Sequence, residues 1–283
     1  MNTSLVARGP QSSPDHRINY LKSLPFFALH VACLLAFFTG VSWKAAVLCF
    51  SLYAVRMFAI TAGFHRYFSH KTYQTSRFFQ FILAWIGCSA LQKGPLWWAS
   101  HHRRHHQHSD QEEDVHSPEH MGFWWSHVGW ILSSKYEGTD FKIIQDFARY
   151  PELRWLNRFH VIPGIVLAIL CFLFASWQGL VWGFFISTVL LYHGTFVINS
   201  LCHMFGKRRY ETTDTSRNSL LLAILTLGEG WHNNHHYYAT STNQGFFWWE
   251  LDVSYYILRL CSLFHLVWGL KITPQHILDA AKS

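Results

Sequence analysis

The sequence predicts an all-α membrane protein: four transmembrane helices arranged as two hairpins, with a cytosolic helical cap that holds a di-metal site. Two observations carry this prediction. Half of the 283 residues are apolar and only 14% are charged, whereas about 25% of the residues are charged in soluble domains. In addition, histidines gather in short clusters that each lie beside a long apolar stretch.

Four apolar stretches form the predicted spans, at residues 24–41, 45–63, 161–177 and 180–201. A transmembrane helix needs about 20 predominantly apolar residues, with a range of about 17 to 25, so the first stretch lies near the lower limit. Only a few residues separate the first stretch from the second and the third from the fourth. Short connections make antiparallel neighbours, and each pair is therefore expected to form a hairpin.

The positions of Lys and Arg predict how these spans are oriented. Both residue types are common before the first span, between the second and third spans and after the fourth, whereas the two hairpin tips together hold only Lys44. Short loops rich in Lys and Arg stay in the cytosol. We therefore expect a multi-pass protein of a bacterial inner membrane or endoplasmic reticulum, with both termini and the histidine clusters on the cytosolic side. The net charge of +7 reflects the same bias. The basic residues form no separate domain of the kind that would indicate nucleic-acid binding.

The chain is expected to form one domain over residues 24–270, because it contains neither an internal repeat nor a low-complexity linker. A cytosolic N-terminal tail, 1–23, and a C-terminal tail, 271–283, flank this domain. Two inserts, 64–160 and 202–270, are expected to build the cytosolic cap.

Several shorter segments and single residues complete the prediction. The apolar stretch 78–91 is too short to span a membrane and is predicted to be an interfacial or buried helix. A helix is predicted at 217–227 and an amphipathic or interfacial helix at 248–270. Arg56, inside the second span, is expected to face protein or to extend toward the membrane surface. The six cysteines lie in apolar context without C-x-x-C spacing, which is typical of buried thiols in a reducing compartment.

Nine histidines fall into four clusters, and these clusters point to metal binding. Neutral imidazole is the commonest metal ligand in proteins, and eight or more imidazoles without matching cysteines are too many for one tetrahedral zinc ion. Two metal ions are the economical interpretation. The clusters are His65 with His70; His102, His105 and His106; His203 preceded by Asn199; and His232, His235 and His236.

The spacing within the clusters predicts how they converge. On a helix, H-x-x-H-H places three residues on one face, so the clusters that begin at His102 and His232 are each expected to point in one direction. His65 and His70 differ by about 140° on a regular helix and can share a site only if the helix ends there. Asn199 and His203, four residues apart, are expected on one face, where Asn199 can hold a metal-bound water.

Residues near the clusters are candidates for orienting the ligands through their second ring nitrogen. The expected carboxylate partners are Asp110, Glu112, Glu113 and Asp114, and a solvated acidic loop is the alternative interpretation. The neighbouring histidines are His101, His108, His116, His120 and His127.

The boxes H-x-x-x-x-H, H-x-x-H-H and H-x-x-H-H, in this order, resemble those of the integral-membrane fatty-acyl desaturases of the Δ9, stearoyl-CoA desaturase type. The resemblance covers residues 54–259. It includes the contexts Ile60-Thr-Ala-Gly-Phe-His65-Arg, Trp125-Ser-His-Val-Gly-Trp130, Asn199-Ser-Leu-Cys-His203-Met-Phe-Gly206 and Gly228-Glu-Gly-Trp-His232-Asn-Asn-His-His236.

This resemblance implies a set of site residues. A bent tunnel for the acyl chain is implied, with Gln92, Trp98 and Thr195 at its kink, and Phe196 stands where the family commonly has a tryptophan. A di-iron centre is implied, with Asn199 holding one iron through water. The implied iron ligands are His65, His70, His102, His105, His106, His203, His232, His235 and His236.

The resemblance also implies an O2-dependent desaturase that introduces a cis double bond, at Δ9, into a saturated long-chain acyl-CoA or acyl-lipid. Removing hydrogen from an unactivated methylene needs a redox metal and O2, and imidazole ligands suit iron. The sequence shows no cytochrome b5-like haem domain, iron–sulfur motif or flavin fingerprint. The electrons are therefore expected from a separate ferredoxin, rubredoxin or cytochrome b5.

Two other functions fit part of the pattern. A histidine-box membrane hydroxylase or other oxygenase would use the same metal chemistry. A membrane metal transporter or sensor would instead place its ligands along a path through the membrane, whereas the clusters here lie at the predicted cytosolic ends of the spans.

Overall fold

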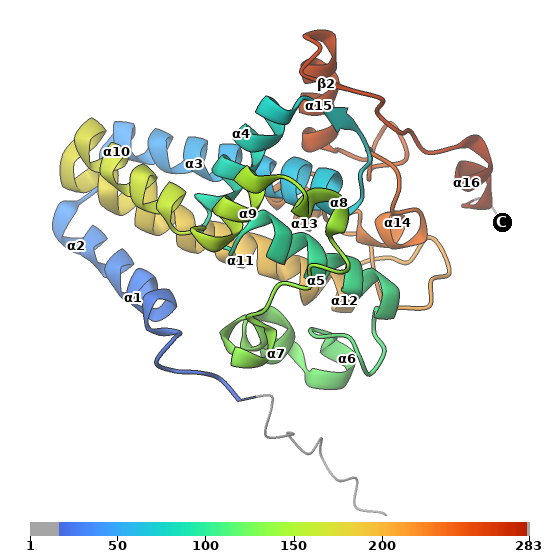
Figure 1. Ribbon diagram of the computed structural model, residues 1–283, viewed down its shortest axis with the longest axis horizontal. Helices are drawn as coiled ribbons and strands as arrows, with labels where there is room; N and C mark the ends of the chain where they lie inside the picture. Colours follow the sequence, from blue (N-terminus) through green and yellow to red (C-terminus); the bar gives the residue numbers. More distant parts are fainter. Residues whose placement is uncertain (1–16, 282–283) are drawn as a thin grey trace, which may run out of the picture.

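The computed structural model describes residues 17–281, and it is mostly helical, as the sequence predicts. Long helices pack together at one end of the molecule, and shorter helices and loops gather at the other end (Figure 1). The predicted N-terminal tail, 1–23, falls largely outside the described residues. The division into one domain and two tails stays a prediction.

The first hairpin joins two helical stretches through a glycine turn. Its first arm runs through α1 (Leu24–Ala32), a short 3-10 segment and α2 (Ala36–Thr39). Gly40 follows with a φ of 61°, which favours glycine because other residues are strained there. The second arm is α3 (Trp43–Phe58), and it continues as the π-helical segment η3 (Ala59–Ser69).

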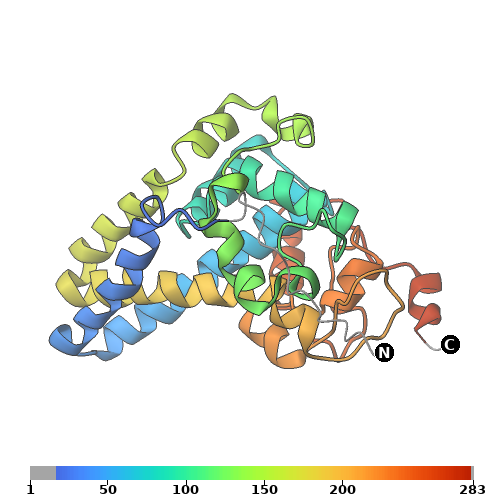
Figure 2. The same ribbon diagram turned by 90° about the horizontal axis from the view of Figure 1, so that it is seen from below.

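The second hairpin is built from one long helical run that reverses direction. Its first arm is α10 (Ile162–Gln178), which departs from helical geometry at Ala175 and Ser176. The returning arm, visible in yellow in Figure 2, comprises η6 (Gly179–Ile186), α11 (Ser187–Asn199) and α12 (Leu201–Met204). A Cβ atom at Gly179 would lie 2.0 Å from the carbonyl oxygen of Cys171, so the close contact of the two arms requires glycine there.

The tips of the two hairpins meet. The Gln178 amide donates to the carbonyl of Thr39 at 2.8 Å, and the Trp182 indole donates to the carbonyl of Gly40 at 2.8 Å. Both tips therefore lie at one end of the molecule, away from the histidines.

Two helices in residues 17–281 are long and apolar enough to cross a membrane, Trp43–Ser69 and Ile162–Met204, and the second contains the reversal. Leu24–Thr39 is apolar but shorter. Large apolar side chains on the outer surface of the hairpins are exposed, including Phe38 at 86% and Trp43 at 82%. The structure thus supports long apolar helices, whereas the number of spans stays a prediction.

Short helices and one small sheet make up the rest. Strands β1 (Gln74–Thr75) and β2 (Val267–Trp268) are antiparallel, with Gln74 opposite Trp268. The helices of the first insert are α4 (Arg77–Cys88), α5 (Pro95–His108), α6 (Pro118–Met121), α7 (Phe123–His127), α8 (Gln145–Ala148) and α9 (Pro151–Arg158), with 3-10 turns at Gly129–Leu132 and Ser134–Tyr136. The later helices are α13 (Leu220–Leu225), α14 (His232–Tyr237), α15 (Val253–Leu263) and α16 (Gln275–Ala280).

The predicted helix at 78–91 corresponds to α4, but the helix predicted at 248–270 was too long. The carboxylate of Glu250 accepts the backbone N–H groups of Phe246 and Phe247, which stabilises a turn before α15. Asp252 then caps α15 by accepting from the N–H of Tyr255, and the chain after α15 forms β2. Side-chain hydrogen bonds of this kind compete with helix formation.

The core lies where α3 and η3 pack against α4, α5 and α11. Its buried side chains include Met57, Phe64, Phe68, Leu96 and Leu191. Arg56 is also buried, with 1% exposure. It faces protein, donating to the Thr188 hydroxyl at 2.7 Å and to the carbonyl of Leu52 at 3.0 Å, which agrees with the first of its two expected positions.

Candidate metal centre

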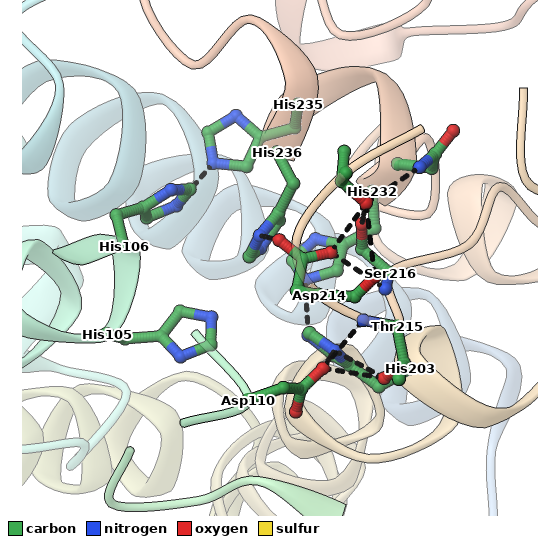
Figure 3. A network of polar contacts seen from close by, with 12 residues as sticks. His105, His106, Asp110, His203, Asp214, Thr215, Ser216, His232, His235 and His236 are labelled. Atoms are coloured by element: carbon green, nitrogen blue, oxygen red, sulfur yellow. Dashed lines mark hydrogen bonds and ion pairs between the residues drawn. The ribbon is translucent and has the colours of Figure 1, made fainter. Parts of the chain in front are cut away.

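The nine clustered histidines converge from four parts of the chain into two adjacent groups. Within each group, the nitrogen atoms that face one another all lie within 4.8 Å. The first group is His65, His70, His102, His106 and His235, and the second is His105, His203, His232 and His236. Figure 3 shows all four histidines of the second group, together with His106 and His235 of the first group.

The two H-x-x-H-H boxes divide their histidines between the groups, which corrects the expectation that each box points in one direction. In α5, His102 and His106 belong to the first group and His105 belongs to the second. Consecutive residues on a helix are about 100° apart, so adjacent side chains face different neighbours.

The box in α14 is divided in the opposite sense, since His232 and His236 belong to the second group and His235 to the first. In both boxes the residues four apart stay together. Each box thus links the two groups.

His65 and His70 share a group because η3 ends at Ser69, as the sequence analysis required, and because its turns are π-helical. In a π-helix, a backbone N–H bonds to the carbonyl five residues earlier. The N–H of His70 donates to the carbonyl of His65 at 3.2 Å, which places both side chains on one face. Their ring centroids are 4.9 Å apart.

Asn199 and His203 lie on either side of a break in the helix. Asn199 ends α11, and Ser200, with φ −105° and ψ −72°, separates it from α12. The ring of His203 then points at His232, with their Nε2 atoms 3.1 Å apart. Asn199 borders the cavity described below.

Carboxylates hold the second ring nitrogen of four of the nine histidines. The Nδ1 atoms of His203, His105 and His236 donate to Asp110, Asp114 and Asp214 at 3.0, 3.1 and 2.7 Å. His65 Nδ1 contacts Glu229. Such contacts orient a ligand and fix its tautomer.

Two of these four carboxylates were expected and two were missed. Asp110 and Asp114 were among the four predicted partners, whereas Glu112 and Glu113 are exposed. Asp214 lies in the loop after α12, and no motif marked it. Glu229 lies three residues before His232, and this short spacing to the histidine box could have marked it as a candidate partner.

The neighbouring histidines have other contacts. His101 Nε2 lies 3.0 Å from the carbonyl of Gly138, His120 Nε2 lies 2.8 Å from the carbonyl of Asp110, and His127 contacts Ser200. His116 is buried beside Asp114, with its ring 4.3 Å from that of His105. The Gln244 amide lies 3.2 Å from His65 Nδ1 and 3.5 Å from His235 Nδ1, whereas His232 Nδ1 has no partner among residues 17–281.

The electrostatics of the site suit metal binding. Burial, followed by the neighbouring imidazoles, lowers the pKa of His232 and His235 well below the usual value, so both rings are neutral near pH 7. Burial opposes ionisation of Asp214, but the hydrogen bonds from His236 and Ser216 outweigh it and hold the pKa of this carboxyl well below its usual range. Neutral imidazoles backed by ionised carboxylates are the protonation states that metal ligation needs.

We expect Asp214→Asn to lower metal affinity by about 10- to 100-fold, because an amide cannot accept the His236 N–H as strongly as a carboxylate does. Titration of the stripped protein with Fe²⁺ would measure this change. Glu113→Gln, at an exposed residue of the acidic segment 110–114, should leave the affinity unchanged. Equal affinities for the two variants would contradict the role assigned to Asp214.

An apolar cavity of about 280 Å³ reaches the metal centre. His102 and Asn199 line it, and so do all three residues expected at the kink of a substrate tunnel. The Gln92 amide donates to the Thr195 hydroxyl at 3.0 Å, and the Trp98 ring stacks on His102 with 5.0 Å between centroids. These three side chains therefore form one wall beside a proposed metal ligand.

The fold and site define a class of protein: two groups of histidines that suit a metal cofactor lie beside long apolar helices and at the end of an apolar cavity. Residues 41–268 match the family described as "Fatty acid desaturase". The chain belongs to the fatty acid desaturase family, and it is accordingly an oxidoreductase of the fatty-acyl desaturase type.

Similar proteins differ in their named substrates. The chain is 36% identical to the "sn-1 stearoyl-lipid 9-desaturase" of Anabaena variabilis, over 93% of this chain and 98% of that protein. It is 36% identical to the "sn-2 palmitoyl-lipid 9-desaturase" of Nostoc sp., over 97% and 98%. It is 38% identical to the "Acyl-CoA C20 Delta5-desaturase" of Anemone leveillei, over 87% and 80%. Both acyl carriers and two double-bond positions thus occur among these relatives.

Proposed function

We propose that the protein introduces a cis double bond at Δ9 into a saturated long-chain acyl group, using a histidine-ligated di-iron centre, O2 and electrons from a separate carrier. The observation that carries this proposal is the cavity that runs past Gln92, Trp98 and Thr195 to His102 and Asn199. A linear apolar chain in this cavity would lie beside His102 of the first histidine group and beside Asn199.

The nine histidines fit a pair of iron ions, because they form two groups with four or five imidazole nitrogens each. We assign His65, His70, His102, His106 and His235 to one ion. His105, His203, His232 and His236 would hold the other, and Asn199 would hold one iron through water. When bound, the iron pair supplies the oxidising power that removes hydrogen from an unactivated methylene.

The protein's own residues then determine which methylene reacts. The Gln92–Thr195 hydrogen bond and the Trp98 ring hold the bend of the acyl chain, and a fixed bend places one C–C bond beside the metal centre. Holding the reacting atoms in position is a large part of catalysis. The bend also favours the cis geometry. The buried carboxylates Asp110, Asp114, Asp214 and Glu229 keep the imidazoles oriented throughout.

The membrane arrangement is part of the same proposal. We assign four spans in one domain over residues 24–270, with both hairpin tips on one side and the histidines on the cytosolic side. The contacts between the tips, Gln178 with Thr39 and Trp182 with Gly40, support the placement of both tips on one side. The excess of Lys and Arg at the histidine end supports the orientation. A ferredoxin, rubredoxin or cytochrome b5 would deliver electrons from the cytosol.

The test is expression in a host that lacks desaturases, followed by mass spectrometry of the fatty acids. We expect new monounsaturated chains with the double bond at carbon 9, and none with His232→Ala. His276→Ala, at an exposed histidine of α16, is the matched control and should keep activity. A hydroxylated product would instead identify a hydroxylase, and product from His232→Ala would refute the site assignment.

A further inference from the structure

Aromatic rings extend outward from the second histidine group toward the surface. The ring of the proposed ligand His105 lies 4.3 Å from the ring of His116, and the His116 ring lies 5.0 Å from that of Trp130, centroid to centroid. The Trp130 ring in turn lies 6.4 Å from that of Tyr136. His105 belongs to α5, His116 to the loop before α6, and the other two to the 3-10 turns after α7, so only the tertiary structure aligns these rings.

A second series of rings reaches Trp130 from the first histidine group. The Trp98 ring stacks on the proposed ligand His102 with 5.0 Å between centroids, and it packs against the cluster of Trp97, Val115 and Trp130. Within that cluster, the rings of Trp97 and Trp130 are 5.7 Å apart and nearly parallel, with 10° between their planes. Trp130 is therefore connected to both histidine groups through neighbouring rings. We call the following five residues the aromatic row: Trp97, Trp98, His116, Trp130 and Tyr136.

Burial gives the aromatic row a direction from the inside of the protein to the outside. Trp130 is buried, with 6% exposure, whereas Tyr136 is only half-buried. The Trp97 indole donates to the backbone carbonyl of Tyr136 at 2.8 Å, which fixes the turn that carries Tyr136 against the stacked tryptophans. The row thus leads from buried metal ligands to a phenol ring that water can reach.

Packing alone does not explain a tryptophan at position 130. Its Nε1 atom is buried and has no hydrogen-bond partner among residues 17–281, although an indole N–H is a donor and buried polar groups are usually paired. A phenylalanine would fill the space without this cost, but its ring does not give up an electron readily. An oxidised indole that has no base on its N–H keeps its proton, so one electron restores it. The environment of Trp130 therefore suits reversible electron transfer.

The proposed reaction gives such a transfer a purpose. Removing hydrogen from a methylene needs a strong oxidant, and this oxidant attacks the protein when no acyl chain fills the cavity. Trp98, which stacks on His102 and lines the cavity, is the exposed target. A protein that uses a reactive cofactor also has to suppress competing reactions. Tryptophan and tyrosine give electrons only to a strong oxidant, so the aromatic row does not carry the low-potential electrons that reduce the resting centre. It acts only after O2 has been activated.

We propose that the aromatic row protects the protein by passing electrons from Tyr136 through Trp130 to the metal centre when O2 is activated without an acyl chain in the cavity. In each event Trp130 gives one electron toward the centre and takes one from Tyr136, whose phenol releases its proton to water. The one-electron carrier that supplies the reaction then returns one electron to Tyr136, and a proton from water restores the phenol. This inference rests on the proposed desaturase function and adds a protective activity to it.

The test is to mix the purified, iron-loaded full chain, reduced with dithionite and freed of excess reductant, with O2 in the absence of any acyl chain. Samples frozen during the reaction are examined by electron paramagnetic resonance. We expect an organic radical whose signal narrows when the protein contains ring-deuterated tyrosine, because deuterium couples more weakly to the unpaired electron. Tyr136→Phe should abolish this tyrosine signal. Trp130→Phe should reduce it, and this variant should fold with full iron content because no hydrogen bond of the Trp130 indole is lost.

The control is Trp124→Phe, at a tryptophan of α7 that is 77% exposed and outside the aromatic row. It should leave the radical unchanged. Peptide mapping after repeated exposure to O2 should show faster oxygen addition to Trp98 in Trp130→Phe and Tyr136→Phe than in the wild type or the control.

Three results would overturn the proposal: no tyrosine radical while O2 reoxidises the iron, equal loss of the radical in Trp124→Phe, or equal oxidation of Trp98 in all variants. If the expressing host forms double bonds but no radical appears, the aromatic row fails alone. If the radical depends on Tyr136 and Trp130 but the host forms no double bond, the proposed desaturase function fails and the electron path stands.

Discussion

Replacing either His105 or His106 by alanine is expected to abolish desaturation and to remove about one of two metal ions per chain, because the two residues face different histidine groups. The residues are adjacent on α5, so the two substitutions change the helix almost identically. Metal analysis of the purified variants, together with fatty-acid analysis of expressing cells, measures both effects.

The two variants should differ in which ion they lose. Without His106, the group containing His65, His70, His102 and His235 keeps four imidazoles, and without His105 the other group keeps three. His105→Ala is therefore expected to lose the ion of its group more completely than His106→Ala does, because three imidazoles remain there instead of four. His108→Ala, on the same helix but in neither group, should retain both ions and full activity. Loss of both ions in His108→Ala would contradict the assignment.

Arg66→Met is expected to destabilise the protein by about 3 to 5 kcal/mol, the cost of leaving buried charges without their partner. Arg66 is fully buried and donates to Glu229 at 3.0 Å, to Asp252 at 2.9 Å and to the carbonyl of Thr242 at 2.8 Å. Its removal leaves two buried carboxylates without their guanidinium partner. We expect the Tm of the purified protein to fall by about 10 °C or more.

Arg77→Met is the matched control, because Arg77 binds Glu152 through the same pair of nitrogens but at the exposed surface. Water screens such pairs, and their removal has little effect on stability. An equal fall in Tm for the two variants would contradict the role of burial. Arg66→Met should also lower metal content, since Glu229 contacts the ring of His65.

Much of the site could be predicted from residue types and spacing. The nine histidines, Asn199, Gln92, Trp98 and Thr195 were all singled out from the sequence and its family resemblance, and the structure places them around one cavity and its metal centre. Imidazole side chains rarely cluster except to bind a metal, so metal binding could be predicted without knowing the fold. The long apolar stretches could also be predicted, because length and apolar composition alone indicate a helix that can span a membrane.

The arrangement of the ligands could not be predicted, because it depends on local backbone geometry. A regular helix would have separated His65 from His70, and the π-helical turns of η3, which ends at Ser69, bring them together. The division of His105 from His106, and of His235 from His236, depends on where the facing helices lie. Helical spacing specifies directions around one axis, but it does not say which partner stands in each direction.

The sequence by itself determined the chemistry of this protein: imidazole ligands for a metal, apolar helices beside them, and membership of the desaturase class. The tertiary structure decided which residues act together. Asp214 meets His236, and Glu229 meets Arg66 and His65. The physical reason is that carboxylates, lysines and single histidines have many roles on a protein surface, and only burial beside a specific partner selects one.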